Sequence, residues 1–380
     1  RGEGVYLWDE NDKKYLDMMS AYSAVSHGHS NPRVVEALKQ QAETLCIVSR
    51  AFYTDKLGAF LKLACDVTGQ DMALPMNTGA EAVETAVKAA RRWGYESKGI
   101  ETDKAEILVC TGNFHGRTTT IISFSDEAEY QKNFGPLTPG FKVIDYGDAD
   151  ALEAAITPNT AAFLVEPIQG EGVIIIPPKG YLKRCKEICE ANNVLLIADE
   201  IQCGLGRSGR MLACDHEDVK PDGLILGKAL GGGVMPVSMF LARKDVMDIF
   251  VPGTHGSTFG GNPLAAAVGT AALNILVEDQ LADRSRDMGD YMLADLNKID
   301  SGLIQDIRGA GLFIGVEIDP AKGTAREVCE RLMDRGLLCK ETHVTVGRLA
   351  PPRIITRDQI DWAISESRDV LLELAVVGLA

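Results

Sequence analysis

Two residues that could share one reaction follow neighbouring apolar segments of the sequence. Asp199 follows the apolar segment 194–198, and Lys228 comes shortly after the segment 224–226. Parallel strands end at the same edge of a sheet, so this carboxylate and this amine would meet there in a partly desolvated cleft. Taken alone, each has an ordinary explanation, because most lysines are solvated and many aspartates at strand ends cap a turn.

The motif Asn77-Thr78-Gly79-Ala80-Glu81 could hold a phosphate group. Its glycine lets the backbone approach a ligand closely, and the helix that follows offers free N–H groups and a positive dipole end. By itself the motif is better interpreted as a helix capped by threonine. Combined with the amine and the carboxylate, it suits pyridoxal phosphate, which needs a lysine, an acid at the pyridine nitrogen and a phosphate cradle.

Other motifs point to structural roles. Residues 204–209 (GLGRSG) match the dinucleotide pattern G-x-G-x-x-G, but no strand runs directly into them and no clean amphipathic helix follows, so we expect a glycine loop. Cys185 and Cys189 are two of nine cysteines, which we interpret as reduced thiols, with this pair as small buried hydrophobes. His27 and His29 have no third ligand nearby, so we expect no metal site.

Alternating strand and helix patterns in the middle of the chain predict βαβ units and a mostly parallel sheet. The predicted strands are residues 107–110, 161–165, 194–198 and 224–226, and the predicted helices are residues 80–93 and 182–192.

After about residue 277 the pattern changes to charged helices and a strand pair, which predicts a smaller α+β domain. The expected elements there are the strand pair 307–318, a helix at 324–335 and a last helix from Arg357. A hairpin with its turn at residues 10–12 is expected to join this smaller domain. The predicted division is an N-terminal segment 1–21, a large domain 22–278 and a small domain 279–380.

Composition excludes several classes of protein. The 380 residues are 46% hydrophobic and 24% charged, which excludes disordered and collagen-like chains. A formal net charge of −15 opposes sequence-independent binding of nucleic acid. The longest mostly apolar stretch, residues 264–277, is too short to cross a bilayer, so no membrane partner is expected. We expect a cytoplasmic protein, with the mitochondrial matrix as the alternative because the N-terminus is not complete.

Over nearly its whole length the chain resembles the class III pyridoxal-phosphate aminotransferases of the ornithine and acetylornithine type. The motifs that carry the resemblance occur in family order: MNTGAEAVETAVKAARRWGY, NFHGRT, VEPIQGEG, LLIADEIQCGLGRSGR, LGKALGGG and HGSTFGGNPLA. The resemblance implies a fold-type I α/β enzyme, with a mostly parallel seven-stranded sheet between helices in its large domain. It also implies a homodimer with composite active sites.

The resemblance assigns five residues to the cofactor ring. Lys228 would form the Schiff base, Asp199 would partner the pyridine nitrogen, and Gln202 would bind the 3-hydroxyl group. Phe114 would stack on one face of the ring, and Ile201 would press on the other.

Four further residues are assigned to the cofactor phosphate. Gly79 and Ala80, preceded by Thr78, would hold the phosphate at the start of the helix. Thr258 would reach the phosphate of the neighbouring subunit's cofactor.

The resemblance also implies transfer of the δ-amino group of L-ornithine to 2-oxoglutarate, giving glutamate 5-semialdehyde and glutamate. Tyr6 would contact the α-amino end of ornithine, and Tyr22 would narrow the pocket. Arg117 would bind the α-carboxylate of ornithine, and later the distal carboxylate of 2-oxoglutarate. Arg348 would bind the α-carboxylate of 2-oxoglutarate, and Glu171 would mask it during the ornithine half-reaction.

Two positions depart from the family pattern and leave the amino donor open. Gly347 and Leu349 flank Arg348 where a larger apolar residue and a phenylalanine are expected, which would loosen the second carboxylate pocket. N-acetylornithine, or a broader set of ω-amino acids such as 4-aminobutyrate, is therefore the alternative donor. His115 is expected only to buttress Arg117.

Overall fold

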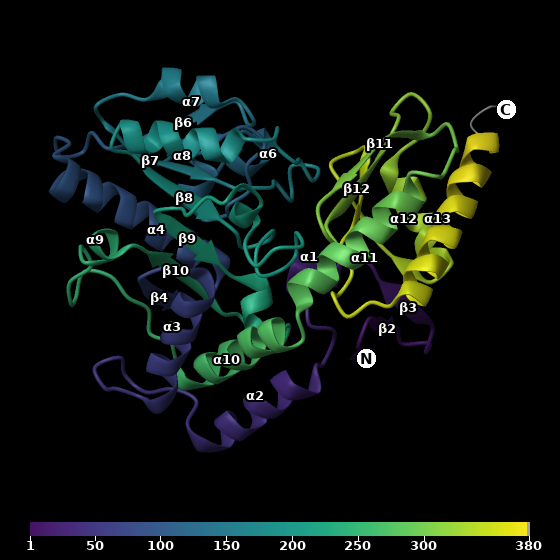
Figure 1. Cartoon of the computed structure of the whole chain (residues 1–380), viewed down its shortest axis with the longest axis horizontal. Helices are drawn as coiled ribbons and strands as arrows, with labels where there is room; N and C mark the ends of the chain where they lie inside the picture. Colours follow the sequence, from purple (N-terminus) through teal and green to yellow (C-terminus); the bar gives the residue numbers. More distant parts are fainter. Residues whose placement is uncertain (378–380) are drawn as a thin grey trace.

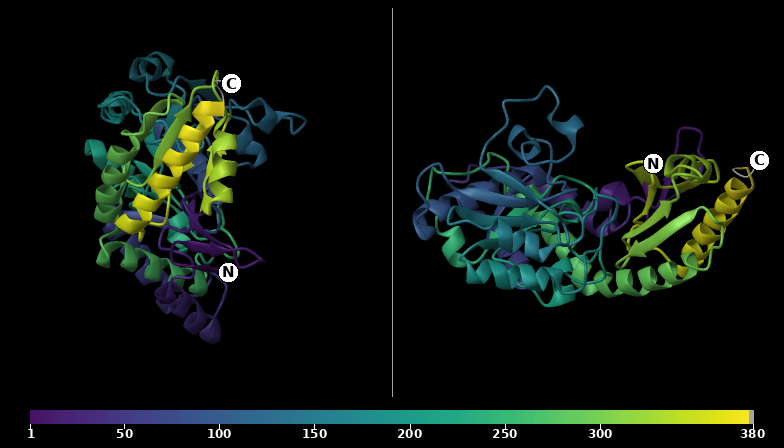
Figure 2. Two further views of the ribbon diagram at one scale, coloured as in Figure 1. Left: turned by 90° about the vertical axis from the view of Figure 1, so that its right-hand side faces the viewer. Right: turned by 90° about the horizontal axis from the view of Figure 1, so that it is seen from above.

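The computed structural model describes residues 1–377, which form two bodies side by side (Figures 1 and 2). The larger body is built on a seven-stranded sheet, and all neighbouring strands except β10 run parallel, as the expected fold class requires. β10 is antiparallel to both of its neighbours, β9 and β4. In sheet order the strands are β4 (Met72–Met76), β10 (Ser238–Ala242), β9 (Gly223–Leu226), β8 (Leu195–Asp199), β7 (Thr160–Val165), β5 (Glu106–Cys110) and β6 (Phe141–Ile144).

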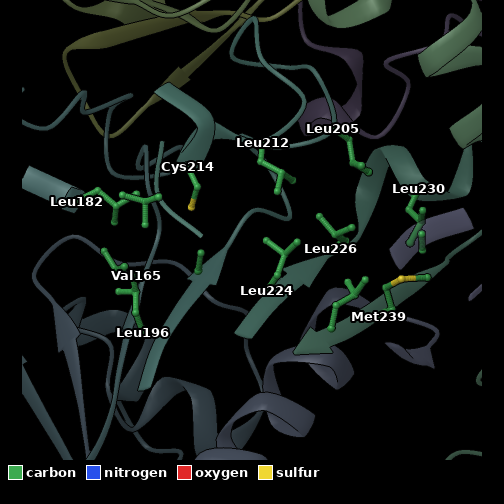
Figure 3. Packing of buried hydrophobic residues seen from close by; sticks show 14 of the residues in the cluster. Val165, Leu182, Leu196, Leu205, Leu212, Cys214, Leu224, Leu226, Leu230 and Met239 are labelled. Carbon is green, nitrogen blue, oxygen red and sulfur yellow. The ribbon is translucent and has the colours of Figure 1, made fainter. Parts of the chain in front are cut away.

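Helices cover both faces of this sheet, which explains why its central strands are apolar on both sides. Val165, Leu196 and Leu224 point into one core, where Figure 3 shows them with Leu182 and Cys214. Alternate residues of the same strands pack on the other face against α4. The main helices of this body are α2 (Pro32–Thr44), α3 (Asp55–Thr68), α4 (Gly79–Trp93), α7 (Ala149–Ala155), α8 (Tyr181–Ala191) and α10 (Pro263–Glu278).

Shorter helical segments connect these elements. They are α1 (Ser20–Ser23), α5 (Thr119–Ile122), α6 (Ala128–Gln131), α9 (Lys244–Met247), a π-helical extension of α4 at Gly94–Lys98, and 3₁₀ turns at Ala213–Glu217 and Lys228–Gly231.

The smaller body joins both ends of the described chain in one core. Val5 and Leu16 pack with residues of the C-terminal segment such as Leu312 and Leu371. Its four-stranded antiparallel sheet has the order β11 (Ile304–Gly309), β12 (Ile314–Ile318), β15 (Val346–Leu349) and β14 (Lys340–Thr342). Its helices are α11 (Leu281–Leu296), α12 (Ala325–Asp334) and α13 (Arg357–Val377).

The N-terminal hairpin lies where the sequence predicts it. β2 (Tyr6–Trp8) pairs with β3 (Lys14–Asp17), and the carboxylate of Asp9 closes the turn by accepting from the N–H groups of Asn11 and Lys13. β1 (Gly2–Glu3) extends this small sheet on one side, and β13 (Leu337–Leu338) pairs in parallel with β3 on the other. We retain 1–21, 22–278 and 279–380 as the proposed domain division.

No single helix within residues 1–377 is long and apolar enough to cross a membrane. The pair α10 and α11 passes such a test only when taken together, and the two helices are bent by 58°. Much of α10 is buried against α2 and α3, which accounts for its apolar sequence.

Candidate active site

The carboxyl ends of β8 and β9 bring the two predicted polar residues to one edge of the large sheet. Asp199 is the last residue of β8, and Lys228 follows β9 with a left-handed φ of 45°. The Lys228 amine donates a hydrogen bond of 3.1 Å to Oε1 of Gln202. Burial and the Arg348 charge lower the pKa of Lys228, while Glu171 and Asp199 act in the opposite direction. The enclosed amine is therefore easier to deprotonate than a surface lysine.

Asp199 is held by His115, which the sequence interpretation placed elsewhere. His115 Nδ1 lies 2.6 Å from Asp199 Oδ2, and the two side chains are 0% and 3% exposed. The other carboxylate oxygen accepts from the N–H of Ile201 at 3.0 Å. Burial disfavours the charged imidazole, but Asp199 raises the pKa of His115 above its ordinary value. The expectation that His115 only buttresses Arg117 is wrong, because its side chain turns inward whereas Arg117 is exposed.

Glu166 is a second buried residue that sequence reasoning missed. It directly follows β7, and its carboxylate accepts from the N–H of Phe114 at 3.0 Å. Burial is the main cause that raises the pKa of Glu166 to about 7, and the nearby Asp199 charge acts in the same direction. The argument that selected Asp199, a polar residue at the end of a buried strand, would have selected Glu166 as well.

The start of α4 forms a cradle of free backbone N–H groups. Thr78 caps the helix, and the Glu81 carboxylate accepts from the N–H groups of Thr78 and Asn77. Within residues 1–377 nothing accepts from the N–H groups of Gly79 and Ala80. A Cβ atom at Gly79 would lie 3.0 Å from Cδ1 of Ile201, so glycine leaves this approach open.

These residues fit pyridoxal phosphate on several independent observations. The free N–H groups at the start of α4 suit its phosphate, and Asp199 suits its ring nitrogen. Nε2 of Gln202 is buried without a hydrogen-bond partner in the described chain, so it is available to donate to a polar atom of a ligand. Phe114 follows β5 and Ile201 follows β8, so both lie beyond the carboxyl ends of parallel strands of the large sheet. Thr258, by contrast, is exposed on the segment before α10.

A cavity of about 540 Å³ opens beside Lys228. Its lining includes Tyr22, Phe114, Arg117, Glu171 and Arg348, so the structure brings most of the predicted substrate-binding residues together.

Arg348 and Glu171 form the ion pair that the sequence interpretation expected. Arg348 Nη1 lies 2.9 Å from Glu171 Oε1, and the arginine side chain is 1% exposed. Burial acts to raise the pKa of Glu171, but the charge and hydrogen bond of Arg348 hold it below its ordinary value. Glu171 therefore stays ionised and neutralises the arginine.

Arg117 is the exposed arginine of the cavity. Its guanidinium lies 4.7 Å from the Tyr130 ring centroid and donates to the Tyr130 hydroxyl at 3.4 Å. In the described part of the chain no carboxylate lies within ion-pair distance of it. Arg117 is therefore free to bind a carboxylate that enters the cavity.

The two tyrosines proposed for the substrate lie in different places. Tyr22 lines the cavity, and the Arg348 guanidinium lies 4.9 Å from its ring centroid. Tyr6 does not line the cavity. Its hydroxyl accepts from Gln359 at 3.1 Å, and the Lys14 ammonium lies 3.5 Å from its ring centroid. The expectation for Tyr6 is corrected, because the hairpin directs this side chain toward the small domain.

The departures beside Arg348 do not loosen the carboxylate pocket. Side chains alternate along β15, so Gly347 and Leu349 face the opposite side from Arg348. Both border a small apolar cavity of about 30 Å³ in the core of the small domain. The expectation of a looser pocket is therefore wrong.

The remaining motifs have structural partners. Arg207 in the glycine loop 204–209 is buried and donates to the carbonyl groups of Leu312 and Pro351, which ties the two bodies together. His27 contacts the carbonyl of Ala272, and His29 pairs with Asp17. Cys185 and Cys189 are buried in the core, as predicted. Residues 1–377 contain no group of three or more His, Cys, Asp or Glu placed to hold a metal ion.

Comparison with known sequences gives consistent matches over almost the whole chain. The family described as "Aminotransferase class-III" matches residues 1–371. An ornithine aminotransferase of Geobacillus sp. is 56% identical over 97% of this chain and 92% of its own length. "Ornithine aminotransferase 2" of Staphylococcus aureus is 58% identical, with the same two coverages.

Solved structures agree with the sequence matches. Ornithine aminotransferase from Toxoplasma gondii superposes with a TM-score of 0.97 at 47% identity, covering 98% of this chain and 90% of that one. A second structure of the Toxoplasma enzyme, with a TM-score of 0.98 at 46% identity over 100% and 91% of the two chains, is described with pyridoxal phosphate at its active site. Acetylornithine aminotransferase from Elizabethkingia anophelis has a TM-score of 0.88 at 46% identity, covering 98% of this chain and 93% of that one.

Proposed function

The chain belongs to the class-III aminotransferase family, and from this premise we propose that it transfers the δ-amino group of L-ornithine to 2-oxoglutarate. The products are glutamate 5-semialdehyde and glutamate. Pyridoxal phosphate, when bound, supplies the electron sink that allows an amino group to leave one carbon and be passed to another.

Lys228 is proposed to move the proton during this reaction. Its lowered pKa favours the neutral amine, which can accept the proton from the δ-carbon of ornithine. Asp199 is proposed to hold the ring nitrogen of the cofactor in its protonated form, because an ionised carboxylate stabilises a neighbouring cation.

The other assigned residues are proposed to hold the cofactor in place. Thr78, Gly79 and Ala80 would bind its phosphate at the start of α4. Phe114 and Ile201 would enclose its ring, and the unpartnered amide of Gln202 is available for the 3-hydroxyl group.

The proposal for the substrates rests on one observation: the cavity holds one masked arginine and one open arginine. Ornithine carries a single carboxylate, so Arg117 suffices for it while Glu171 covers Arg348. 2-Oxoglutarate carries two carboxylates and needs both arginines, so Glu171 must move away from Arg348 when it binds. Tyr22 lies against Arg348 and limits the space beside it.

Single-turnover measurements of the two half-reactions test this arrangement. Arg348→Ala should damage the 2-oxoglutarate half-reaction much more than the ornithine half-reaction, because only the former needs a second anchor. Glu171→Ala should leave Arg348 uncovered and shift donor preference from ornithine toward α-amino donors such as glutamate. Equal damage to both halves in Arg348→Ala, or unchanged donor preference in Glu171→Ala, would refute the masking role.

We also propose that the enzyme acts as a homodimer in the cytoplasm. Phe52, Tyr53 and Phe259 are 67%, 105% and 57% exposed, and such apolar exposure is typical of an interface. A hydrogen bond of 2.5 Å from Arg50 to the carbonyl of Gly260 joins the two segments that carry them. Thr258 lies beside Phe259, so dimerisation would bring it toward the partner's phosphate site. The cytoplasmic location is supported by the bacterial origin of the matched relatives.

A further inference from the structure

The cavity beside Lys228 is lined by four glutamates, and three of them have ionic partners. Glu171 pairs with Arg348 at 2.9 Å, and Glu129 pairs with Lys132 at 3.2 Å. Glu341 lies 3.8 Å from the amine of Lys340. Within residues 1–377 Glu127 alone among the four has no ion-pair partner.

Glu127, which has no ion-pair partner in the described chain, and Arg117 line the same cavity, and both contact Tyr130. Glu127 precedes α6, and the N–H of Tyr130 donates to its carbonyl at 3.0 Å. The Tyr130 hydroxyl and ring in turn contact the Arg117 guanidinium. Tyr130 therefore connects the two charged residues, and all three line the cavity. α6 lies at the edge of the large body that faces the small one (Figure 1).

The segment that carries Glu127 is firmly held. Its N–H donates to Oγ of Ser125, and the Gln131 side chain donates to the carbonyls of Ile122 and Ser125 at 3.0 and 2.7 Å. The glutamate itself is half-buried rather than fully solvated. A carboxylate held at this position loses further water when a substrate fills the cavity, which is unfavourable unless the substrate brings a positive charge.

We propose that Glu127 binds the α-ammonium group of the amino donor while Arg117 binds its α-carboxylate. This assignment deepens the proposed function and rests on it, since it places the amino-acid head of ornithine at the cavity wall and leaves the δ-amine for the Lys228 end. One negative and one positive side chain, each without an ionic partner in the described chain, match the two charges of that head.

Together, Glu127 and Arg117 provide a physical basis for discrimination between amino donors. L-Ornithine has a free α-ammonium group, which would neutralise Glu127. In N-acetyl-L-ornithine the same nitrogen is a neutral amide, so Glu127 would lose water without gaining an ionic partner. 4-Aminobutyrate has no α-substituent at all and would leave Glu127 unmatched in the same way. Glu127 is therefore a specificity-determining residue.

Kinetics of the holoenzyme variants Glu127→Gln and Glu129→Gln test the assignment. The second variant is a matched control, because Glu129 lines the same cavity but is already paired with Lys132. Glu127→Gln should lower kcat/KM for L-ornithine by roughly ten- to a hundredfold, the usual effect of losing a charge-assisted hydrogen bond. For N-acetyl-L-ornithine the same substitution should raise kcat/KM or leave it unchanged, because it removes a charge that this donor cannot neutralise. Glu129→Gln should change kcat/KM appreciably for neither donor.

Competitive inhibition supplies a readout that does not depend on turnover of the tested compound. L-Norvaline carries the head of ornithine without the δ-amine, and pentanoate carries the carboxylate alone. Glu127→Gln should weaken inhibition by L-norvaline by a similar factor. It should leave inhibition by pentanoate unchanged or stronger, because pentanoate brings no positive charge to Glu127. Equal losses for both donors, or an unchanged inhibition constant for L-norvaline, would overturn the assignment.

The wild-type enzyme separates this inference from the proposed function. Failure of the wild type to use L-ornithine would refute the proposed function itself. Turnover of ornithine by the wild type with unaltered donor selectivity in Glu127→Gln would refute only the role of Glu127.

Discussion

At the scale of single residues, the orientation of Asp199 depends on the groups packed around it. Both of its oxygens are hydrogen-bonded, one by His115 and one by the N–H of Ile201. These two contacts fix the orientation of the Asp199 side chain, which is proposed to partner the ring nitrogen of the cofactor. Glu166 is a second buried carboxyl group that interacts with Asp199 and His115. Because its pKa is raised, it adds less negative charge to this cluster than an ordinary glutamate would.

Replacing His115 should therefore weaken cofactor binding. His115→Phe removes the 2.6 Å hydrogen bond and should weaken pyridoxal phosphate binding by about tenfold, or roughly 1.4 kcal/mol. His115→Asn can still donate from a similar position and should retain most of the affinity. Titration of the apoenzymes with the cofactor gives both dissociation constants.

Repeating the substitution of His115 in the Asp199→Asn variant makes the test specific for the contact with Asp199. In Asp199→Asn the carboxylate is already gone, so adding His115→Phe should cost little more. Wild-type affinity in His115→Phe, or full additivity of the two substitutions, would show that His115 does not act through Asp199.

At the scale of elements, the start of α4 requires a glycine for close packing rather than for backbone conformation. A Cβ at Gly79 would meet the Ile201 side chain at 3.0 Å, so Ile201 would have to shift within the proposed ring site. We predict that Gly79→Ala weakens cofactor binding severalfold. Gly58 in α3 is the matched control, because a Cβ there meets nothing within 4 Å.

The control substitution, Gly58→Ala, is expected to stabilise the protein. Gly58→Ala should raise the free energy of unfolding by about 0.5 to 1 kcal/mol, since alanine is the better helix former. It should leave the cofactor dissociation constant unchanged. Urea unfolding and cofactor titration of both variants decide the matter, and equal cofactor affinity in Gly79→Ala and Gly58→Ala would contradict the packing argument.

Elements with a strong local pattern were predictable from the sequence. β5 is apolar after Glu106, β8 is apolar up to Asp199, and α4 has the expected cap at Thr78. Three strands of the large sheet, β4, β6 and β10, were not among the predicted strands. β4 contains Pro75, which is tolerated at this edge of the sheet. The expected number of strands therefore depended on the family resemblance.

Side-chain directions were harder to predict than elements. His115 and Arg117 are close in the sequence, yet the first is buried against Asp199 and the second is exposed in the cavity. The orientation of Gly347 and Leu349 followed from strand alternation once β15 was known. Tyr6 was misplaced because its neighbours in space, such as Gln359, come from the far end of the chain.

At the scale of the whole molecule, buried glutamates couple stability to pH. Burial raises the pKa of both Glu166 and Glu200 from 4.5 to about 7. Between these values the folded protein binds more protons than the unfolded chain, so each glutamate lowers the free energy of unfolding as pH rises. Burial lowers the pKa of His27 from 6.5 to about 3. Between these two pH values His27 therefore raises the free energy of unfolding as pH rises, which is the opposite effect.

Comparison of Glu166→Gln with the wild type isolates one of these contributions. From pH 5 to pH 8 the variant should gain stability relative to the wild type, by on the order of 2 kcal/mol, because it has no carboxyl to ionise. Urea unfolding of the apoenzymes at several pH values measures this difference. A difference that does not change with pH would mean that Glu166 ionises as readily in the folded protein as in the unfolded chain.

The proposed dimer can be tested at its most exposed residue. Tyr53→Asp places a charge in the apolar surface formed by Phe52, Tyr53 and Phe259, and should shift the protein toward monomers. Activity should fall with dissociation if Thr258 completes the partner's site. Light scattering and activity measured over the same range of protein concentration test both points. A wild-type enzyme that is monomeric and fully active would contradict the composite site.

The most direct test of the central claim is a comparison of amino donors with the purified holoenzyme and 2-oxoglutarate. The structure predicts that L-ornithine has a higher kcat/KM than N-acetyl-L-ornithine, because the cavity presents Arg117 and Glu127, neither of which has an ion-pair partner within residues 1–377, to a charged amino-acid head. The carbonyl product should be the aldehyde at the δ-carbon. Preference for N-acetyl-L-ornithine, or a 2-oxo acid formed by loss of the α-amino group of ornithine, would contradict the claim.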